Sequence, residues 1–375
     1  MAEPAAPADA TRPTVQVWDA GVRLGHWLLA AAVGVAALTG FVLGPRWLAW
    51  HLAAGVSVIV VVGWRAVWGV LGPTYARFAG FVFPPAAVLA HLRGRQHTRH
   101  VGHNPLGALM VLALLPVLTA IVLTGTLALG GMLKQGPLRA FLSYAAGRGW
   151  LGLHNTLAIA LLVMIGAHLA GVAAESWRGR ENLTRAMLTG SKPADPPFAA
   201  VRPAAARPAL AAAVVLSAVA VGTGGVAALA ALPGRGVPPA EPDPMVAEQC
   251  GACHLAFPSS LAPAATWSAI LADLKHHFGA DASLSPAQAA HIRDWLDANA
   301  AERWDTLPAH LLRQPAADGS RRITDTPGWR RRHRHIAASV FAGKDGIRRS
   351  DCAACHADAA TGRFAPQRIA LPAAQ

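Results

Sequence analysis

Long apolar stretches alternate with short polar connections over the first two-thirds of the chain. A helix crosses the apolar core of a bilayer in about 20 residues. Five stretches come close to this length or exceed it, and they cover residues 26–43, 47–71, 105–132, 150–177 and 209–232. The pattern therefore predicts five membrane-spanning helices in this part of the chain.

The pattern changes after residue 233. Residues 234–244 are rich in Pro and Gly, which is typical of a semi-rigid linker. Beyond them we predict a helix over residues 266–278, and Ser285 with Gln288 predicts a capping box at the start of another helix. The predicted divisions are a disordered N-terminus (1–16), a membrane domain (17–192), a loop with the fifth spanning helix (193–233), the linker (234–244) and a small α-helical domain (245–375).

The composition supports a membrane protein, because 53% of the residues are hydrophobic and only 14% are charged. A formal net charge of +13 would also suit a nucleic-acid-binding protein. However, residues 1–233 hold 17 Lys and Arg against 6 Asp and Glu, whereas residues 234–375 are nearly balanced. The excess therefore lies in the loops between the spans, and we expect no nucleic-acid partner.

The distribution of basic residues also predicts an orientation. With the N-terminus in the cytoplasm, twelve Lys and Arg fall in cytoplasmic loops and four in outer loops, as the positive-inside rule requires. The first twenty residues lack the basic-then-apolar order of a signal peptide, so we expect the first span to direct insertion. Five spans then place the C-terminal domain in the periplasm, outside a bacterial inner membrane.

Four histidines lie within the predicted spans: His26, His51, His154 and His168. Ionisable residues are costly there and usually serve a function, although packing is the alternative for any one of them. His154 and His168 share a helix, about 21 Å apart in depth and about 40° apart around its axis. In the predicted topology His26 lies at the depth of His168, and His51 at the depth of His154. Because facing helices can supply both axial ligands of a haem iron, we predict two b-type haems, one for each pair.

Other polar residues of the membrane half leave two interpretations open. His91, His97, His100 and His103 lie in the loop before the third predicted span. A metal site is one interpretation, but no carboxylate or thiolate accompanies them in this loop, and we expect a solvated basic loop. Arg65 lies near the cytoplasmic end of the second span, where it either reaches the interface or contacts a haem propionate.

The four cysteines form two copies of one motif. The copies are Cys250-Gly-Ala-Cys253-His254 and Cys352-Ala-Ala-Cys355-His356. In Cys-x-x-Cys-His both thiols bond a c-type haem covalently and the histidine is the proximal iron ligand. A redox dithiol and a zinc site are the alternatives, and a second histidine-terminated copy favours haem over both. Covalent attachment takes place outside the cytoplasm, in agreement with the predicted orientation.

The second axial ligands of these haems are predicted to be histidines. Met245 is the one methionine after residue 187, so the chain cannot supply methionine to two c haems. Helical phase places His277 and His333 on apolar faces, and these are the predicted distal ligands, with His276 and His335 as alternatives.

For the remaining histidines and the basic stretch of the C-terminal domain, the sequence does not indicate one specific role. We expect His291 and His310 to be solvated. The basic stretch Arg330–Arg334 either steers an acidic redox partner, neutralises haem propionates, or is a solvated face.

Residues 15–191 resemble the bacterial cytochrome b561 family, which is related to the membrane cytochrome b subunit of nickel–iron hydrogenases. The matching pieces are Val17-Trp18-Asp19, Val22-Arg23-x-x-His26-Trp27, His51, Gly102-His103-Asn104-Pro105-Leu106-Gly107, His154-x13-His168-x-Ala-Gly-Val and Glu181-Asn182-Leu183-x-Arg185-Ala186-Met187-x-x-Gly190. The resemblance implies that the four histidines of the spans ligate two b haems.

Residues 245–365 resemble the dihaem cytochrome c domain. The matching pieces are Cys-x-Ala-Cys-His-x-Ala-Phe-Pro, His277-Phe278-Gly279 with Asp281-Ala-Ser-Leu, and Ile323-Thr-x-Thr-Pro327. One departure is His276, where an acidic residue is more usual, and it leaves the choice between His276 and His277 open.

Together these observations predict an all-α protein: a transmembrane four-helix di-haem bundle with a fifth spanning helix, followed by a small dihaem cytochrome c domain. Its cofactors would be two haem b and two haem c. The expected function is electron transfer between membrane quinone and a periplasmic cytochrome or other soluble redox protein. The alternatives are a quinol-dependent reductase with an open haem site and a membrane anchor for a larger oxidoreductase such as hydrogenase. Association into a homo-oligomer is left open.

Overall fold

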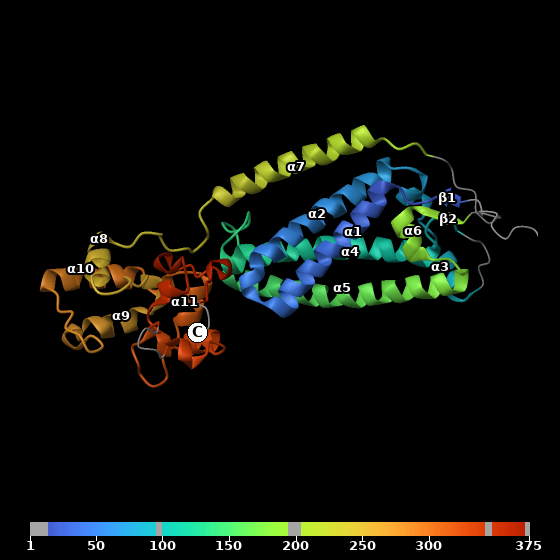
Figure 1. The fold of residues 1–375 in the computed structure, drawn as a ribbon. Coiled ribbons are helices and arrows are strands. Elements are labelled where there is room, and N and C mark those ends of the chain that lie inside the picture. Colours follow the sequence, from blue (N-terminus) through green and yellow to red (C-terminus); the bar gives the residue numbers. More distant parts are fainter. Residues whose placement is uncertain (1–13, 95–99, 194–203, 342–346, 372–375) are drawn as a thin grey trace, which may run out of the picture. The chain divides into compact units, whose positions relative to one another are not determined.

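The computed structural model describes residues 14–94, 100–193, 204–341 and 347–371. In these ranges the regular secondary structure is helical apart from one pair of three-residue strands, which confirms the all-α prediction (Figure 1). It divides into two compact units, residues 1–42, 50–124 and 153–225 in the first and residues 43–49, 125–152 and 226–375 in the second.

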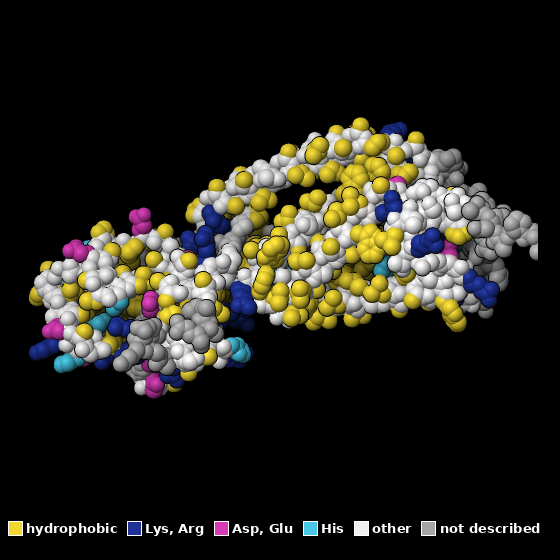
Figure 2. Space-filling model, viewed as in Figure 1, with side chains coloured by type: hydrophobic (Ala, Val, Ile, Leu, Met, Phe, Trp, Pro, Cys, Tyr) yellow, Lys and Arg dark blue, Asp and Glu magenta, His cyan; other side chains and the backbone are white. Residues whose placement is uncertain are grey.

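Five helical segments of the described residues are long and apolar enough to cross a membrane, as predicted. They are Ala20–Leu43, Pro45–Leu71, Pro105–Leu133, Tyr144–Gly179 and Pro208–Ala231. Their α-helical parts are α1 (Ala20–Ala37), α2 (Leu48–Leu71), α4 (Pro105–Ala128), α5 (Tyr144–Gly179) and α7 (Pro208–Ala231). Hydrophobic side chains cover the visible outer faces of these helices (Figure 2), which suits lipid rather than water.

The core of the first unit is a four-helix bundle. Its innermost buried residues are Ala32 of α1, Val58 and Val62 of α2, Leu118 of α4 and Leu161 of α5. Each of the four helices thus contributes an apolar side chain to one common cluster, and the histidines of the spans are carried on three of them.

One end of the first unit is held by polar contacts. Asp19 caps α1 by accepting hydrogen bonds from the backbone N–H groups of Gly21 and Val22. Its Oδ1 also accepts a hydrogen bond of 3.0 Å from Trp68. Strand β1 (Thr14–Gln16) pairs antiparallel with β2 (Ser191–Pro193) at this end. The predicted disordered N-terminus included residues 14–16, which form β1, and residues 1–13 lie outside the described ranges.

Two shorter helices belong to the same unit. They are α3 (Pro85–Leu92) and α6 (Leu183–Thr189). Asn182 caps α6 with its side-chain oxygen, which accepts a hydrogen bond from the backbone N–H of Arg185.

Two of the spans end in π-helical turns. Residues Leu38–Leu43 follow α1, and Leu129–Leu133 follow α4. Such turns insert an extra residue and are frequent at functional sites. A buried threonine lies near each turn, Thr39 in the first and Thr124 before the second.

The second unit contains the C-terminal domain. Its helices are α8 (Pro244–Gly251), α9 (Ala264–Leu271), α10 (Pro286–Ala298), α11 (Leu307–Leu312) and α12 (Pro327–His333). They enclose a core that includes Val246, Trp267, Ile292, Leu296 and Ala300. The predicted capping box is confirmed, because Ser285 and Gln288 exchange both side-chain hydrogen bonds at the start of α10.

The predicted single helix over residues 266–278 is wrong. Helix α9 ends at Leu271, and a 3-10 turn follows at Leu274–His276. The chain then takes positive φ angles at Phe278 and Gly279, 52° and 101°. A right-handed helix cannot continue through such a conformation, so the helical phase used to select His277 does not apply.

Candidate haem sites

The structure brings the eight histidines predicted as iron ligands together in four pairs. The ring centroids are 6.5 Å apart for His26 and His168, 6.0 Å for His51 and His154, 6.1 Å for His254 and His277, and 6.2 Å for His333 and His356. Bonds from a metal to imidazole are about 2 Å long and a ring nitrogen lies about 1 Å from its centroid, so an iron between two rings would separate the centroids by roughly 6 Å. All four pairs fit this requirement.

His51 is oriented by the π-helical turn of the first span. Its Nδ1 lies 3.1 Å from the carbonyl oxygen of Ala36 and 3.2 Å from the hydroxyl of Thr39. Since a carbonyl can only accept, Nδ1 carries the proton and donates it, which leaves the lone pair on Nε2. Gly40 allows this approach, because a Cβ there would lie 3.3 Å from the imidazole ring.

His154 is oriented in the same way from another helix. Its Nδ1 donates to the carbonyl oxygen of Ile121, at 3.0 Å, and lies 3.5 Å from the hydroxyl of Thr124. Both rings of this pair therefore offer Nε2 as the free nitrogen. A backbone acceptor on the other nitrogen is the arrangement that fixes the tautomer and ring orientation of a metal-binding histidine.

The pair of His26 and His168 has fewer hydrogen-bond partners than the pair of His51 and His154. Nδ1 of His26 is buried and has no hydrogen-bond partner in the described structure. Nη1 of Arg65 is likewise buried without a partner, and the guanidinium lies over the ring of Phe78 at 4.6 Å. The carboxylate of Asp19 acts on Arg65 as a counter-charge, but Nη1 keeps a free hydrogen-bond donor that could bind an anionic group. The orphaned Nη1 favours a propionate contact over the interface for Arg65.

The first cysteine motif is accompanied by His277. His254 donates from Nδ1 to the carbonyl oxygen of Leu255 at 2.8 Å, and its ring lies nearly parallel to that of His277, at 19°. Burial, and then the neighbouring His254, lowers the pKa of His277, which favours the neutral form that a ligand needs. His276 instead contacts Asp273 at 2.8 Å, and 75% of its side chain is exposed. The structure thus places His277, and not His276, beside the motif.

The second cysteine motif is accompanied by His333. His333 donates from Nδ1 to the carbonyl oxygen of Trp329 at 2.9 Å and stacks on that indole with centroids 4.2 Å apart. Burial and the proximity of His333 lower the pKa of His356, although Asp358 opposes the shift. His335 is exposed and accepts a hydrogen bond from the neighbouring Arg334, so it is not part of the pair.

The four cysteines are free thiols in the structure. Burial, with Asp351 nearby, raises the pKa of Cys352 to about 11, and burial also raises the pKa of Cys250. Redox dithiols and zinc sites need thiolates, whose pKa is lowered by their surroundings. Across the described ranges no cluster of three or more His, Cys, Asp or Glu side chains is arranged to hold a metal ion. The surroundings of these thiols do not favour either alternative.

The prediction of a solvated histidine loop before α4 is wrong for His91 and His103. Nε2 of His91 lies 3.3 Å from a carboxylate oxygen of Glu175, a residue of α5 far along the sequence. The ring of His103 contacts Trp18 and Phe81 with its Nδ1 buried, and burial, then Arg65 and Lys192, lowers its pKa to about 3.

His100 and His97 are the other two histidines of this loop. Burial, then His91, lowers the pKa of His100, whose Nε2 is buried. His97 lies outside the described residues. Tertiary contacts, which the local sequence does not show, therefore decide the surroundings of His91, His100 and His103.

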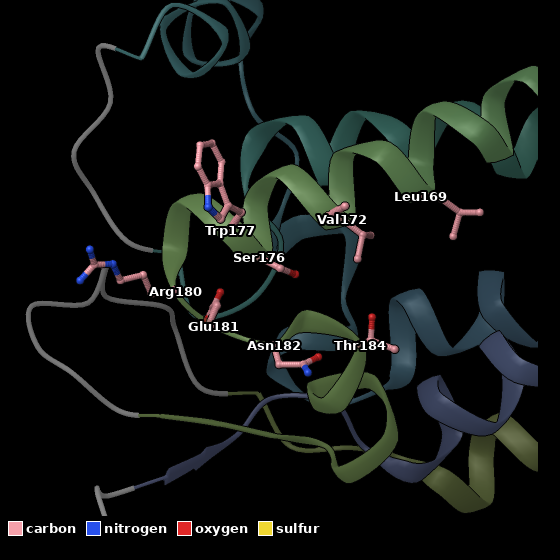
Figure 3. Close-up of a pocket in the computed structure, with 9 residues that line it drawn as sticks. Leu169, Val172, Ser176, Trp177, Arg180, Glu181, Asn182 and Thr184 are labelled. Carbon is pink, nitrogen blue, oxygen red and sulfur yellow. The ribbon is translucent and has the colours of Figure 1, made fainter.

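A hollow of about 640 Å³ lies beside the end of α5 (Figure 3). Leu169, the residue after His168, is part of its lining. Leu169 and Val172 contribute apolar side chains to this lining, and Ser176 and Glu181 contribute polar ones. No sequence pattern predicted this hollow, because its lining residues come together only where α6 follows the end of α5.

Comparisons with known proteins agree with the two resemblances noted above. Residues 17–190 match the family of prokaryotic cytochrome b561, and residues 246–364 match the family of dihaem cytochrome c. A diheme cytochrome c from Rhodobacter sphaeroides is 38% identical over 32% of this chain and 93% of that chain, with a TM-score of 0.28. A diheme cytochrome type c from Shewanella baltica OS155 is 30% identical over 35% of this chain and 93% of that chain, with a TM-score of 0.29. No curated protein matches the chain.

The two family matches agree with the motifs: the chain is a membrane-associated electron-transfer cytochrome whose residues 17–190 match the prokaryotic cytochrome b561 family and whose residues 246–364 belong to the dihaem cytochrome c family.

Proposed function

We propose that this cytochrome carries electrons between quinone in the membrane and soluble redox partners in the periplasm. Two haem b in the bundle and two haem c in the C-terminal domain would form the route. The observation that carries the proposal is the set of four histidine pairs, each with the separation that one iron requires. Two of them adjoin a covalent haem-attachment motif.

The chain's own residues would hold each haem in a six-coordinate state. His26 and His168 would bind one b haem, and His51 and His154 the other. When bound, haem supplies reversible one-electron chemistry at iron. With both axial positions filled by imidazole, a site favours electron transfer over binding of a small substrate, which argues against an open-site reductase.

The two c haems would be bound at the cysteine motifs. His254 and His356 would be proximal ligands, and His277 and His333 distal ligands. The covalent attachments would use Cys250 and Cys253 for one haem and Cys352 and Cys355 for the other. Arg65 would contact a propionate of the b haem between His26 and His168, because its buried Nη1 lacks an acceptor.

The hollow beside α5 supports a quinone site next to the His26–His168 pair. A quinone head group is flat and apolar with two carbonyl oxygens, and the lining combines Leu169 and Val172 with the hydroxyl of Ser176. The cytoplasmic side of the membrane is the expected location of this hollow, from the excess of basic residues in the loops at that side.

The haem content tests the proposal directly. Reduced-minus-oxidised spectra and extracted-haem analysis of the purified full-length protein should give b and c signals in about equal amounts. A preparation that contains all its c haem but no b haem, or the reverse, would contradict the proposed route.

The quinone site is tested with two matched variants of α5. Leu169→Trp should fill the hollow and slow the reduction of haem b by added quinol several-fold, with haem content unchanged. Leu162→Trp, on the same helix but outside the hollow, should leave that rate as it is. Equal rates in the two variants would place the quinone elsewhere.

A further inference from the structure

A buried cation in the turn between α4 and α5 has its counter-charge in the dihaem cytochrome c domain. Lys134 follows the π-helical turn Leu129–Leu133 with a left-handed backbone, φ 52°, and only 2% of its side chain is exposed. Its ammonium donates hydrogen bonds to the carbonyl oxygen of Leu142, at 2.8 Å, and to Oδ2 of Asp305, at 2.9 Å. These residues all belong to the second compact unit.

The burial of Lys134 makes the turn dependent on the domain. Removing an ammonium group from water is costly unless a carboxylate and further acceptors replace the lost hydration. Asp305 is the carboxylate that does so here. Without it, Lys134 would either stay buried with an uncompensated charge or leave its position for solvent. The conformation around Lys134 therefore requires Asp305, more than 150 residues away in the sequence.

Both carboxylate oxygens of Asp305 have hydrogen-bond partners, from residues 134–144 and from its own domain. Oδ2 accepts hydrogen bonds from the Lys134 ammonium and, at 2.8 Å, from the backbone N–H of Tyr144. Oδ1 contacts Nε2 of His310 at 2.9 Å. Burial alone would raise the pKa of Asp305, but the hydrogen bonds from His310, Lys134 and Tyr144 lower it below its ordinary value. The carboxylate is thus held in its charged form.

The contact continues around this ion pair. The rings of Tyr144 and His310 stack with centroids 4.2 Å apart, so the prediction that His310 is solvated is wrong. Gln367 of the dihaem domain donates a hydrogen bond of 2.8 Å to Gln135. The 3-10 turn Pro366–Arg368 also packs against the 3-10 turn Pro45–Trp47 at the start of the second span.

The predicted linker takes part in the same contact. Arg139 donates from Nε to the carbonyl oxygen of Leu232 at 2.8 Å, and the backbone N–H of Arg235 donates to the carbonyl oxygen of Arg139 at 2.9 Å. Gly236 accepts a backbone hydrogen bond of 2.8 Å from Asp305, and a Cβ at Gly236 would lie 2.6 Å from that of Asp305. The chain leading into the domain is therefore bound to the turn as well.

We propose that residues 129–144 are a docking surface for the dihaem cytochrome c domain, and that the Lys134–Asp305 pair locks the domain onto it. The domain is then held by residues 129–144 as well as by its covalent connection through residues 234–244. The proposal concerns the contact alone and does not depend on quinone being the electron donor or acceptor.

Hydrogen exchange of the full-length holoprotein in lipid nanodiscs tests the lock. Asp305→Asn and Lys134→Met each remove one charge of the pair. We expect backbone exchange within residues 129–144 and 232–240 to rise about ten-fold or more in both variants. Asp305→Asn leaves the Lys134 ammonium buried without its carboxylate, and Lys134→Met takes from Asp305 its cationic partner, with the contacts to Tyr144 and His310 remaining. The increase in exchange in the double variant should be smaller than the sum of the increases in the two single variants, because both remove the same contact.

Matched controls remove the same charges where no buried contact exists. Asp318→Asn changes an acid whose side chain is 60% exposed, and Arg148→Met removes an exposed cation. Both should exchange like the unmodified protein in these two segments. Visible spectra of the c haems establish that each variant domain is folded. If Asp305→Asn and Lys134→Met keep their c-haem spectra and exchange no faster than the controls, the lock does not exist.

Discussion

The backbone acceptors around the paired histidines specify which ring nitrogen is free. In His51, His154, His254 and His333, Nδ1 faces a carbonyl oxygen at 2.8–3.1 Å, so each ring presents Nε2. A ligand held in this way loses little freedom on binding a metal, because its rotamer and tautomer are already set. Every pair except His26 and His168 contains at least one ring that is oriented in this way.

Replacement of His277 should open one c haem to an external ligand. His277→Ala removes the ring beside His254, so the reduced haem should bind carbon monoxide, which the six-coordinate protein should resist. Carbon monoxide difference spectra measure this. His276→Ala, one residue away, is the matched control and should resist carbon monoxide like the unmodified protein. Binding of the gas to the unmodified protein would instead support a reductase with an open site.

Replacement of His154 tests the route through the bundle. His154→Ala should lower the haem b content to about half, since one pair loses a ligand, and leave the haem c content unchanged. Haem extraction measures both, and His291→Ala, a half-exposed histidine outside the pairs, is the control. Quinol should then reduce the c haems far more slowly. Reduction at the unmodified rate would show that electrons do not pass through this site.

At the scale of elements, close backbone approaches position the ligands of the C-terminal domain. Gly328 lies in the first turn of α12, where a Cβ would collide with the carbonyl oxygen of Leu311 in α11. The two helices can therefore pack only because this residue is glycine. Thr326 caps α12 by accepting a hydrogen bond from Trp329, and the helix ends at His333. The approach of α11 and α12 thus decides where His333 lies.

Gly328→Ala should separate α12 from α11. Overpacking of this kind costs about 1–3 kcal/mol, and we expect a lower urea midpoint for the c-haem absorbance together with weaker ligation by His333. Arg331→Ala, an exposed change in the same helix, should alter the midpoint little. Equal midpoints in the two variants would mean that the helices can move apart without affecting the site.

At the scale of the whole molecule, the docking of the dihaem domain should depend on pH. The folded structure lowers the pKa of Asp305, so its contribution is present above the ordinary carboxyl pKa and is lost as the pH falls through the lowered value. Lys134 and His310 are the titratable side chains that contact it. We therefore expect residues 129–144 to stay protected at neutral pH and to lose protection only in acid, below the ordinary carboxyl pKa.

Hydrogen exchange corrected for the intrinsic pH dependence measures this transition. Asp305→Asn should show low protection at every pH, and Asp318→Asn should follow the unmodified protein. A transition centred near neutral pH would assign the titration to a group other than Asp305.

Composition, period and spacing along the chain were sufficient to predict much of this protein. Five apolar stretches of sufficient length, four histidines within them and two Cys-x-x-Cys-His motifs were enough to predict the all-α class, the spans and the two families. These signals are local or repeat at fixed intervals, and helix geometry converts them directly into depth and face. The pairing of His26 with His168 and of His51 with His154 follows from depth alone.

The tertiary structure decided what depends on residues distant in the sequence. Helix α9 ends before His277, so its neighbour His254, and not a helical face, distinguishes His277 from His276. His91 gains a carboxylate from Glu175. The buried state of Lys134 likewise depends on Asp305. A charged side chain is buried or exposed according to the partners that the whole fold supplies, and neither periodicity nor local composition contains that information.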